Sequence, residues 1–108
     1  MIENTDIAII GAGPSGAIAA SLLRQRGHRV TIVEQTHFPR FSIGESLLPQ
    51  CMAFIAEAGM TEAVADANFQ YKNGAAFVHN GRKAAFDFRQ KFSDGPGTTY
   101  QVQRAAFD

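Results

Sequence analysis

The sequence contains no tryptophan and only one cysteine, Cys51. A single thiol cannot form an internal disulfide or a cysteine-rich metal site. The three histidines, His28, His37 and His79, share no metal-ligand spacing, so we interpret them as surface residues and expect no metal site. A chain without disulfides also suits a reducing compartment.

Net charge and long apolar runs are absent as well. The 10 Lys and Arg residues balance 10 Asp and Glu residues, so we expect no general attraction to nucleic acid or to an anionic membrane. No apolar run approaches the ~20 residues that a membrane-spanning helix needs. The acidic residues Glu3 and Asp6 are unlike the basic start of a signal peptide. The sequence therefore predicts a cytoplasmic protein.

The first third of the chain predicts a strand, a turn, a helix and a second strand. Residues 7–10 are apolar and rich in β-branched side chains, as in a buried parallel strand. Residues 14–26 show helical spacing, and Gly27 is expected to terminate that helix. Residues 30–34 predict the second parallel strand. This order is the βαβ unit of an α/β fold, in a chain of 108 residues that is one domain at most.

The remaining two thirds predict shorter elements. Asn80-Gly81 is a strong hairpin-turn signal between two apolar segments. The other expectations, in chain order, are a loop over 38–49, a helix from Pro49 to Gly59, a short helix capped by Thr61 and running to Ala67, hairpin strands over 75–79 and 83–88, a strand over 99–102 and the first turn of a helix over 104–108.

The last residues carry an inference about completeness. A helix that only begins at residue 104 leaves its apolar face unpacked, and an isolated βαβ unit has unpaired strand edges. We therefore expect residues 1–108 to form the N-terminal part of a larger domain. A complete small domain is the alternative.

Residues 11–16 fit the pattern G-x-G-x-x-G between the first strand and the helix. Gly11 permits a sharp turn, Gly13 lets a pyrophosphate approach the main chain, and Gly16 lets the helix pack closely against the strand. Free amides at the start of the helix face an anion. Glu34 ends the second strand, where a carboxylate accepts hydrogen bonds from ribose hydroxyls and disfavours a 2′-phosphate. The alternative is a tight structural turn with a surface glutamate.

Three further segments resemble flavin-dependent halogenases and their FAD monooxygenase and reductase relatives. Residues 38–49 (F-P-R-F-S-I-G-E-S-L-L-P) look like a hallmark of that family. Residues 69–77 match its lysine before an apolar strand, and residues 103–108 match its arginine followed by F-D. The resemblance covers essentially the whole chain. It is closer to halogenases of phenolic or pyrrolic substrates, often carrier-bound, than to tryptophan-specific ones.

The resemblance implies a Rossmann-like, p-hydroxybenzoate-hydroxylase-like FAD-binding fold, represented here by its N-terminal part. It also implies that Arg40 lies near the adenosine or pyrophosphate and that Arg104 contacts the cofactor from the far side of the sheet. Together, the glycine pattern and the resemblance predict the following FAD-binding residues: Gly11, Ala12, Gly13, Pro14, Ser15, Gly16, Glu34, Gln35, Arg40, Glu45, Ser46 and Arg104.

Lys72 matches the catalytic lysine of the resembled family. The resemblance implies that reduced flavin, O2 and halide generate hypohalous acid, and that the lysine presents electrophilic halogen to an aromatic substrate. An ammonium is a compact donor that can polarise such an oxidant. A separate flavin reductase is an expected partner. From its position alone, Lys72 is a solvated residue on a turn.

Several assignments stay open at this stage. Glu45 and Ser46 either bind flavin or cap the helix that Pro49 opens. The phenylalanines of the second hairpin strand and beyond, Phe86, Phe88 and Phe92, belong either to a core or to one wall of a substrate pocket. Cys51 is expected to be buried and inert.

The absence of tryptophan also limits the functional assignment. The resembled halogenases carry a W-x-W-x-I-P motif further along, which this chain lacks, so that feature does not separate a halogenase from an FAD monooxygenase or reductase. A non-catalytic nucleotide-binding fragment is the third hypothesis.

Overall fold

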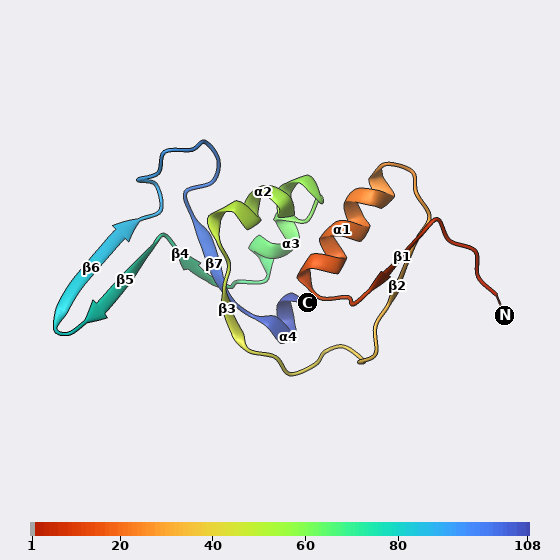
Figure 1. The fold of residues 1–108 in the computed structure, drawn as a ribbon, viewed down its shortest axis with the longest axis horizontal. Helices are drawn as coiled ribbons and strands as arrows, with labels where there is room; N and C mark the ends of the chain where they lie inside the picture. Colours follow the sequence, from red (N-terminus) through yellow and green to blue (C-terminus); the bar gives the residue numbers. More distant parts are fainter. Residues whose placement is uncertain (1) are drawn as a thin grey trace.

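The computed structural model describes residues 2–108, which form an elongated body of 61 × 31 × 26 Å. Figure 1 shows the parallel strands at one end, a hairpin projecting at the other, and helices between them. The elements in chain order are β1 (Ile7–Ile10), α1 (Pro14–Gln25), β2 (Val30–Val33), β3 (Gly44–Ser46), α2 (Pro49–Glu57), α3 (Thr61–Asp66), β4 (Gln70–Lys72), β5 (Gly74–His79), β6 (Arg82–Asp87), β7 (Thr99–Gln103) and α4 (Arg104–Phe107).

The predicted βαβ unit is confirmed. Strands β1 and β2 pair in parallel, with Ile7 opposite Val30 and Ile10 opposite Val33. Helix α1 ends at Gln25, and Gly27 follows its cap with a φ of +91°, a left-handed conformation that favours glycine. Strand β2 ends one residue earlier than expected, so Glu34 lies just beyond the strand.

Close packing between β1 and α1 depends on Gly16. A Cβ at this position would lie 2.0 Å from the carbonyl oxygen of Gly11. Since no side chain fits that space, the third glycine of the pattern has the packing role that the sequence predicts.

A second sheet has the strand order β3-β7-β4, and two of its strands were not expected from the sequence. Residues 38–49 were predicted to be a loop, but 44–46 form β3, antiparallel to β7. Lys72 was alternatively interpreted as a turn residue, but it ends strand β4 opposite Thr99. Both strands are three residues long, too short for an alternating pattern to reveal them.

Helix α2 begins at Pro49, as predicted, but the capping interpretations are wrong. Leu48 is its N-cap residue and no side chain caps the helix, so neither Glu45 nor Ser46 does so. Helix α3 begins after Met60, and Thr61 is its first helical residue rather than its cap. An N-cap must immediately precede the first helical residue, and Ser46 lies too early in the chain.

The core lies between α2, α3 and the second sheet, where Ile55 and Val102 are almost fully buried and Leu47 and Val64 join them. Cys51 packs against this core but is only partly buried, so the expectation of a buried thiol is wrong. Strand β1 is less well covered: the side chain of Ile10 is 92% exposed.

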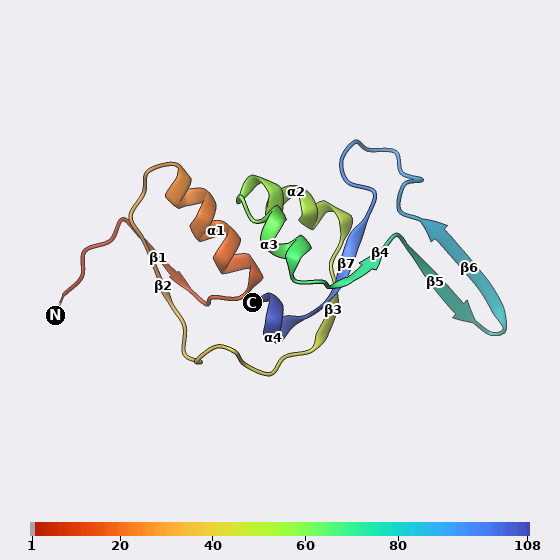
Figure 2. The ribbon, with the colours of Figure 1, turned by 180° about the vertical axis from the view of Figure 1, so that it is seen from behind.

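The predicted hairpin is confirmed as β5 and β6, joined at Asn80 and Gly81, whose φ values are +48° and +73°. Figure 2 shows from behind that it projects away from the helices. The rings of Phe77 and Phe86 stack on it, yet both are about half exposed, and Phe92 is fully exposed. The core interpretation is therefore wrong for Phe86 and Phe92.

None of the helices formed by residues 2–108 is long and apolar enough to cross a membrane.

Candidate functional site

The glycine turn between β1 and α1 leaves open space where side chains would otherwise lie. Gly11 has a φ of +103°, and a Cβ added there would meet no atom within 4 Å. Its amide donates to the carbonyl oxygen of Val33 at 2.8 Å, which ties the turn to β2. Pro14 opens the first turn of α1 and the neighbouring Ser15 is exposed. The start of a helix therefore faces an open space, as an anion site requires.

A hollow of about 420 Å³ lies where β1 and β2 end. This strand-end hollow brings together predicted site residues from the glycine turn and from the segment after β2. Its lining residues are Ile10, Gly11, Gly13, Val33, Glu34, Gln35 and Arg40. Ligands of open α/β sheets bind at this kind of edge, outside the carboxyl ends of the parallel strands.

Glu34 is fixed at the edge of the strand-end hollow. One carboxylate oxygen accepts a hydrogen bond from the amide of Ala12 at 2.9 Å, and the other accepts one from the amide of Thr36 at 3.1 Å. The Ala12 hydrogen bond is the main reason that the pKa of Glu34 lies below its ordinary value. The group is therefore ionised at neutral pH. A carboxylate has about four acceptor positions, and Ala12, Thr36 and Arg40 use three of them, so about one stays available for a ligand hydroxyl.

Two arginines from distant segments meet above Gly13. The position of an added Cβ at Gly13 is 3.5 Å from a terminal nitrogen of Arg104 and 3.6 Å from one of Arg40. Arg40 also contacts Glu34 at 3.3 Å. Both guanidinium groups, although paired with carboxylates, therefore place N–H donors beside the backbone of Gly13.

Asp108, which is not among the site residues predicted from the sequence, orients both arginines. Its carboxylate accepts from Nε of Arg104 at 2.7 Å and from Arg40 at 3.3 Å, and its side chain is 1% exposed. Burial alone raises the pKa of Asp108, but the two arginines outweigh it and leave the pKa below its ordinary value. The spacing of four residues between Arg104 and Asp108 is the signal that could have revealed the pair.

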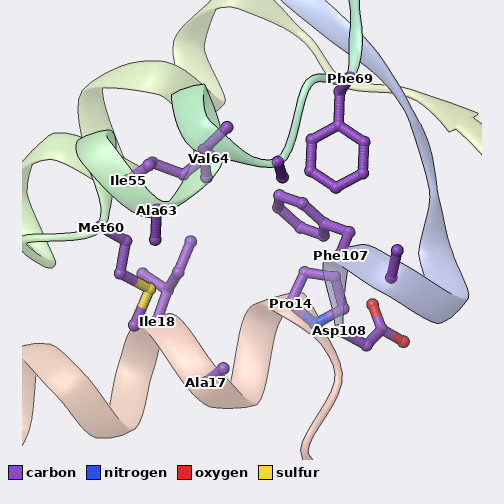
Figure 3. Close-up of a pocket in the computed structure, with 12 residues that line it drawn as sticks. Pro14, Ala17, Ile18, Ile55, Met60, Ala63, Val64, Phe69, Phe107 and Asp108 are labelled. Atoms are coloured by element: carbon purple, nitrogen blue, oxygen red, sulfur yellow. The ribbon is translucent and has the colours of Figure 1, made fainter. Parts of the chain in front are cut away.

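The close-up in Figure 3 shows Asp108 directly after α4, near the start of α1. Phe107 packs edge to face on Phe69, with ring centroids 5.9 Å apart, while the carboxylate of Asp108 lies beside Pro14. The apolar cavity between α1, α3 and α4 has a volume of about 250 Å³. Its lining is mainly apolar, with Asp108 at its edge, so we assign the polar chemistry to the strand-end hollow rather than to this cavity.

The side chains of two other predicted residues, Glu45 and Ser46, contact different partners. Glu45 accepts from Arg104 at 3.0 Å and so joins the arginine pair. Ser46 instead accepts a hydrogen bond from Nζ of Lys72. The structure therefore brings Glu45 to the glycine turn and Ser46 to the lysine.

Lys72 is partly buried at the end of β4. Its Nζ lies 6.0 Å from the centre of the Phe88 ring, within the range of a cation–π contact. Phe88 in turn packs on Phe86 of the hairpin, with the two ring centroids 5.4 Å apart. An ammonium beside aromatic rings can hold an electrophile near a planar substrate. Among residues 2–108, no group of three His, Cys, Asp or Glu side chains has the arrangement of a metal site.

Known proteins resemble the chain over nearly its whole length. It matches the tryptophan halogenase family model over residues 6–105. A tryptophan 2-halogenase from Chondromyces crocatus is 40% identical over 98% of this chain and 20% of its own. The chain thus spans about a fifth of the length of the first curated relatives that it matches.

Solved structures share the fold. A flavoprotein/dehydrogenase from Cytophaga hutchinsonii is 50% identical with a TM-score of 0.91, covering 97% of this chain and 26% of that one. The myxobacterial chondrochloren halogenase CndH, described as an FAD-dependent halogenase, is 38% identical with a TM-score of 0.86, covering 98% and 25%. By the match of its family model and the agreement in fold, this chain belongs to the tryptophan halogenase family.

Proposed function

We propose that this chain binds the ADP half of FAD in a flavin-dependent halogenase and carries the lysine that directs halogen to the substrate. The observation that carries the proposal is the strand-end hollow, where open glycine backbone, an ionised carboxylate and Arg40 converge, with Arg104 close to Gly13. Those three features complement, in turn, a diphosphate, an adenosine ribose and the negative charge of the phosphates.

The adenosine side of the proposal rests on Glu34. Its carboxylate is held by the Ala12 amide at the mouth of the hollow and keeps acceptor capacity for a ribose hydroxyl. Its negative charge disfavours a 2′-phosphate, which argues for FAD or NAD over NADP. Gln35 lines the same hollow and extends the polar edge beside the adenosine.

The diphosphate side rests on Gly13, Arg40 and Arg104. Gly13 has no side chain to cover its backbone, and a terminal nitrogen of each guanidinium group lies close to it. A guanidinium has more N–H donors than the contacts with Glu34, Glu45 and Asp108 use, so both arginines keep donors for an anion. Asp108 and Glu45 orient these donors rather than contact the ligand.

When bound, reduced FAD would supply two of the four electrons that reduce O2 to water, and the halide would supply the other two as it is oxidised. Overall, one aromatic substrate, one halide ion, one O2, one proton and one reduced flavin yield the halogenated aromatic, oxidised flavin and two waters. Lys72 donates a hydrogen bond to the oxygen of the hypohalous acid while the carbon–halogen bond forms and the oxygen–halogen bond breaks. The ring proton leaves, and the oxygen departs as water.

The proposed substrate and partners come from the sequence resemblance to halogenases of phenolic or pyrrolic substrates. We propose a small phenolic or pyrrolic substrate, free or attached to a carrier protein, and a separate flavin reductase. The aromatic rings of Phe86 and Phe88 beside Lys72 are suited to one wall of a site for a planar ring. The expected location is the cytoplasm.

Replacement of Lys72 tests the proposed chemistry. In the natural full-length protein with reduced FAD, O2 and halide, we expect Lys72→Ala to lower product formation roughly 100-fold or more, because the donor to the oxidant is lost. FAD content should not change, since Lys72 lies away from the strand-end hollow. Lys83→Ala, on the exposed hairpin, is the matched control. Undiminished product from Lys72→Ala would overturn the proposal.

A second candidate is an FAD-dependent reductase or monooxygenase on the same fold. It is favoured by the 50% identity to the Cytophaga hutchinsonii flavoprotein/dehydrogenase. This alternative predicts turnover that does not depend on halide, with NAD(P)H consumed by the same polypeptide. Steady-state assays with and without chloride or bromide separate the two candidates.

A further inference from the structure

Strand register places Ser46 and Lys72 on the same face of the second sheet. Ser46 is opposite Gln101 on one side of β7, and Lys72 is opposite Thr99 on the other side. Gln101 and Thr99 are two residues apart on β7, and alternate residues of a strand point to the same face. The lysine side chain therefore reaches diagonally across the central strand towards the serine.

The contact between these two residues is specific. Nζ of Lys72 donates to Oγ of Ser46. Glu45, the neighbour of Ser46, directs its carboxylate to Arg104 instead. Within residues 2–108, the ion pairs involve Asp6, Glu34, Glu45, Asp87 and Asp108, and none includes Lys72. A neutral hydroxyl is therefore the polar tether of this ammonium.

A hydroxyl suits that task better than a carboxylate. An ammonium has three N–H donors, and a single hydrogen bond to serine fixes its direction while the others stay available. A carboxylate would neutralise the charge and attract the donors to itself. The ring of Phe88 lies on one side of this ammonium, with its centre 6.0 Å from Nζ.

We propose that Ser46 is a positioning residue that holds the ammonium of Lys72 in the direction needed for halogen transfer. The inference rests on the proposed role of Lys72 and deepens it. Ser46 does not contact the oxidant. It fixes the lysine so that the carbon–halogen bond forms on substrate before hypohalous acid escapes to solvent.

The test compares Ser46→Ala with Ser46→Thr in the natural full-length protein loaded with FAD. The measured quantities are halogenated product per O2 consumed, kcat, KM, FAD content and melting temperature. We expect Ser46→Ala to lower product per O2 about tenfold through kcat, as loss of one hydrogen bond to a charged group implies. KM and FAD content should stay unchanged. Ser46→Thr should retain most of the coupling, that is, most of the product formed per O2 consumed by the natural protein. Ser93→Ala, on an exposed loop, is the control.

A purely structural role gives a different result. Ser46→Ala would then lower the melting temperature or FAD content while product per O2 stays at the natural value, and the inference would be overturned. If Ser46→Ala does not fold, Ser46→Cys serves in its place, because a thiol is similar in size but a weak acceptor. Natural coupling in Ser46→Cys would equally overturn the inference.

Lys72→Ala, measured in parallel, separates this inference from the proposed function. If Lys72→Ala is inactive and Ser46→Ala is fully coupled, the positioning role fails and the proposed function stands. If Lys72→Ala retains natural activity, the proposed function fails. The double variant should show no loss beyond that of Lys72→Ala, because Ser46 acts through the lysine.

Discussion

The two regions to which we assign a function are built in different ways. The glycine-turn region, residues 7–34, is continuous in sequence and presents backbone without side chains to its proposed ligand. The lysine region is assembled from β3, β4 and β7, which are separated by long stretches of chain, and its chemistry comes from side chains.

This difference determines how each region responds to substitution. In the glycine turn, the missing side chains matter, because added atoms occupy space that the helix or the ligand needs. In the lysine region, the relative position of strands matters, because Ser46 and Lys72 are linked across a third strand. Asp108 connects the regions, since its arginine partners come from segments on either side of β3.

The largest expected effect comes from two changes within the glycine turn. Gly16→Ala places a Cβ 2.0 Å from a backbone oxygen, so we expect a loss of about 3 kcal/mol of stability together with loss of FAD. Gly13→Ala meets only the ends of two arginine side chains, at 3.5 and 3.6 Å. It should fold normally but bind FAD roughly tenfold more weakly, because the methyl group displaces a phosphate contact.

Thermal melting and FAD titration of the natural full-length protein measure this pair of effects. Ala19→Gly, at an exposed position in α1, controls for helix propensity. Equal melting temperatures for Gly16→Ala and Gly13→Ala would contradict the assignment of Gly16 to helix packing and of Gly13 to FAD binding.

An intermediate effect is expected where the two regions meet. Asp108→Asn removes a buried charge that orients two arginines, so we expect a loss of about 2 kcal/mol at neutral pH. Because the folded-state pKa of Asp108 lies below its ordinary value of 3.8, this contribution is present above 3.8 and is lost as the pH falls below it.

The difference in unfolding free energy between the natural protein and Asp108→Asn should therefore narrow as the pH is lowered below 3.8. Denaturant unfolding at several pH values measures it, with Asp94→Asn on an exposed loop as the control. A difference that is constant with pH would show that the charge of Asp108 is not what stabilises the junction.

The smallest expected effect compares two exposed ion pairs. Hydrogen bonds from Arg29 lower the pKa of Asp6 to about 2, and those from Arg89 do the same for Asp87. The pKa of Asp6 should rise towards 3.8 in Arg29→Gln, and that of Asp87 should rise towards 3.8 in Arg89→Gln. NMR titration follows both values. Each contribution to stability is present above pH 3.8 and is lost as the pH falls towards 2.

The effects of the two arginine changes on melting temperature should differ. Arg29 and Asp6 are 23 residues apart and directly precede β2 and β1, whereas Asp87 ends β6 and Arg89 follows it two residues later. Only Arg29→Gln should lower the melting temperature measurably. An equal decrease in melting temperature in Arg89→Gln would show that the sequence separation of the partners does not distinguish these exposed ion pairs.

The sequence predicted the elements whose signals are local. The apolar strand before Gly11, the glycine pattern and Gly27 define the βαβ unit with little help from the rest of the chain. Asn80-Gly81 likewise specifies the hairpin through a turn with positive φ at both residues. The resemblance to halogenases singled out Lys72, but it did not reveal that β3 and β4 are strands.

The sequence by itself determined the α/β class, the position of the glycine turn and the carboxylate that follows β2, because short-range sterics and hydrogen bonding specify them. Only the tertiary structure decided that Arg40 and Arg104 share Asp108 and that Phe92 lies outside the core. It also decided that Ser46 accepts a hydrogen bond from Lys72 and does not cap a helix. Those outcomes depend on pairing between distant strands, and strands of three residues carry too few side chains to encode their partners.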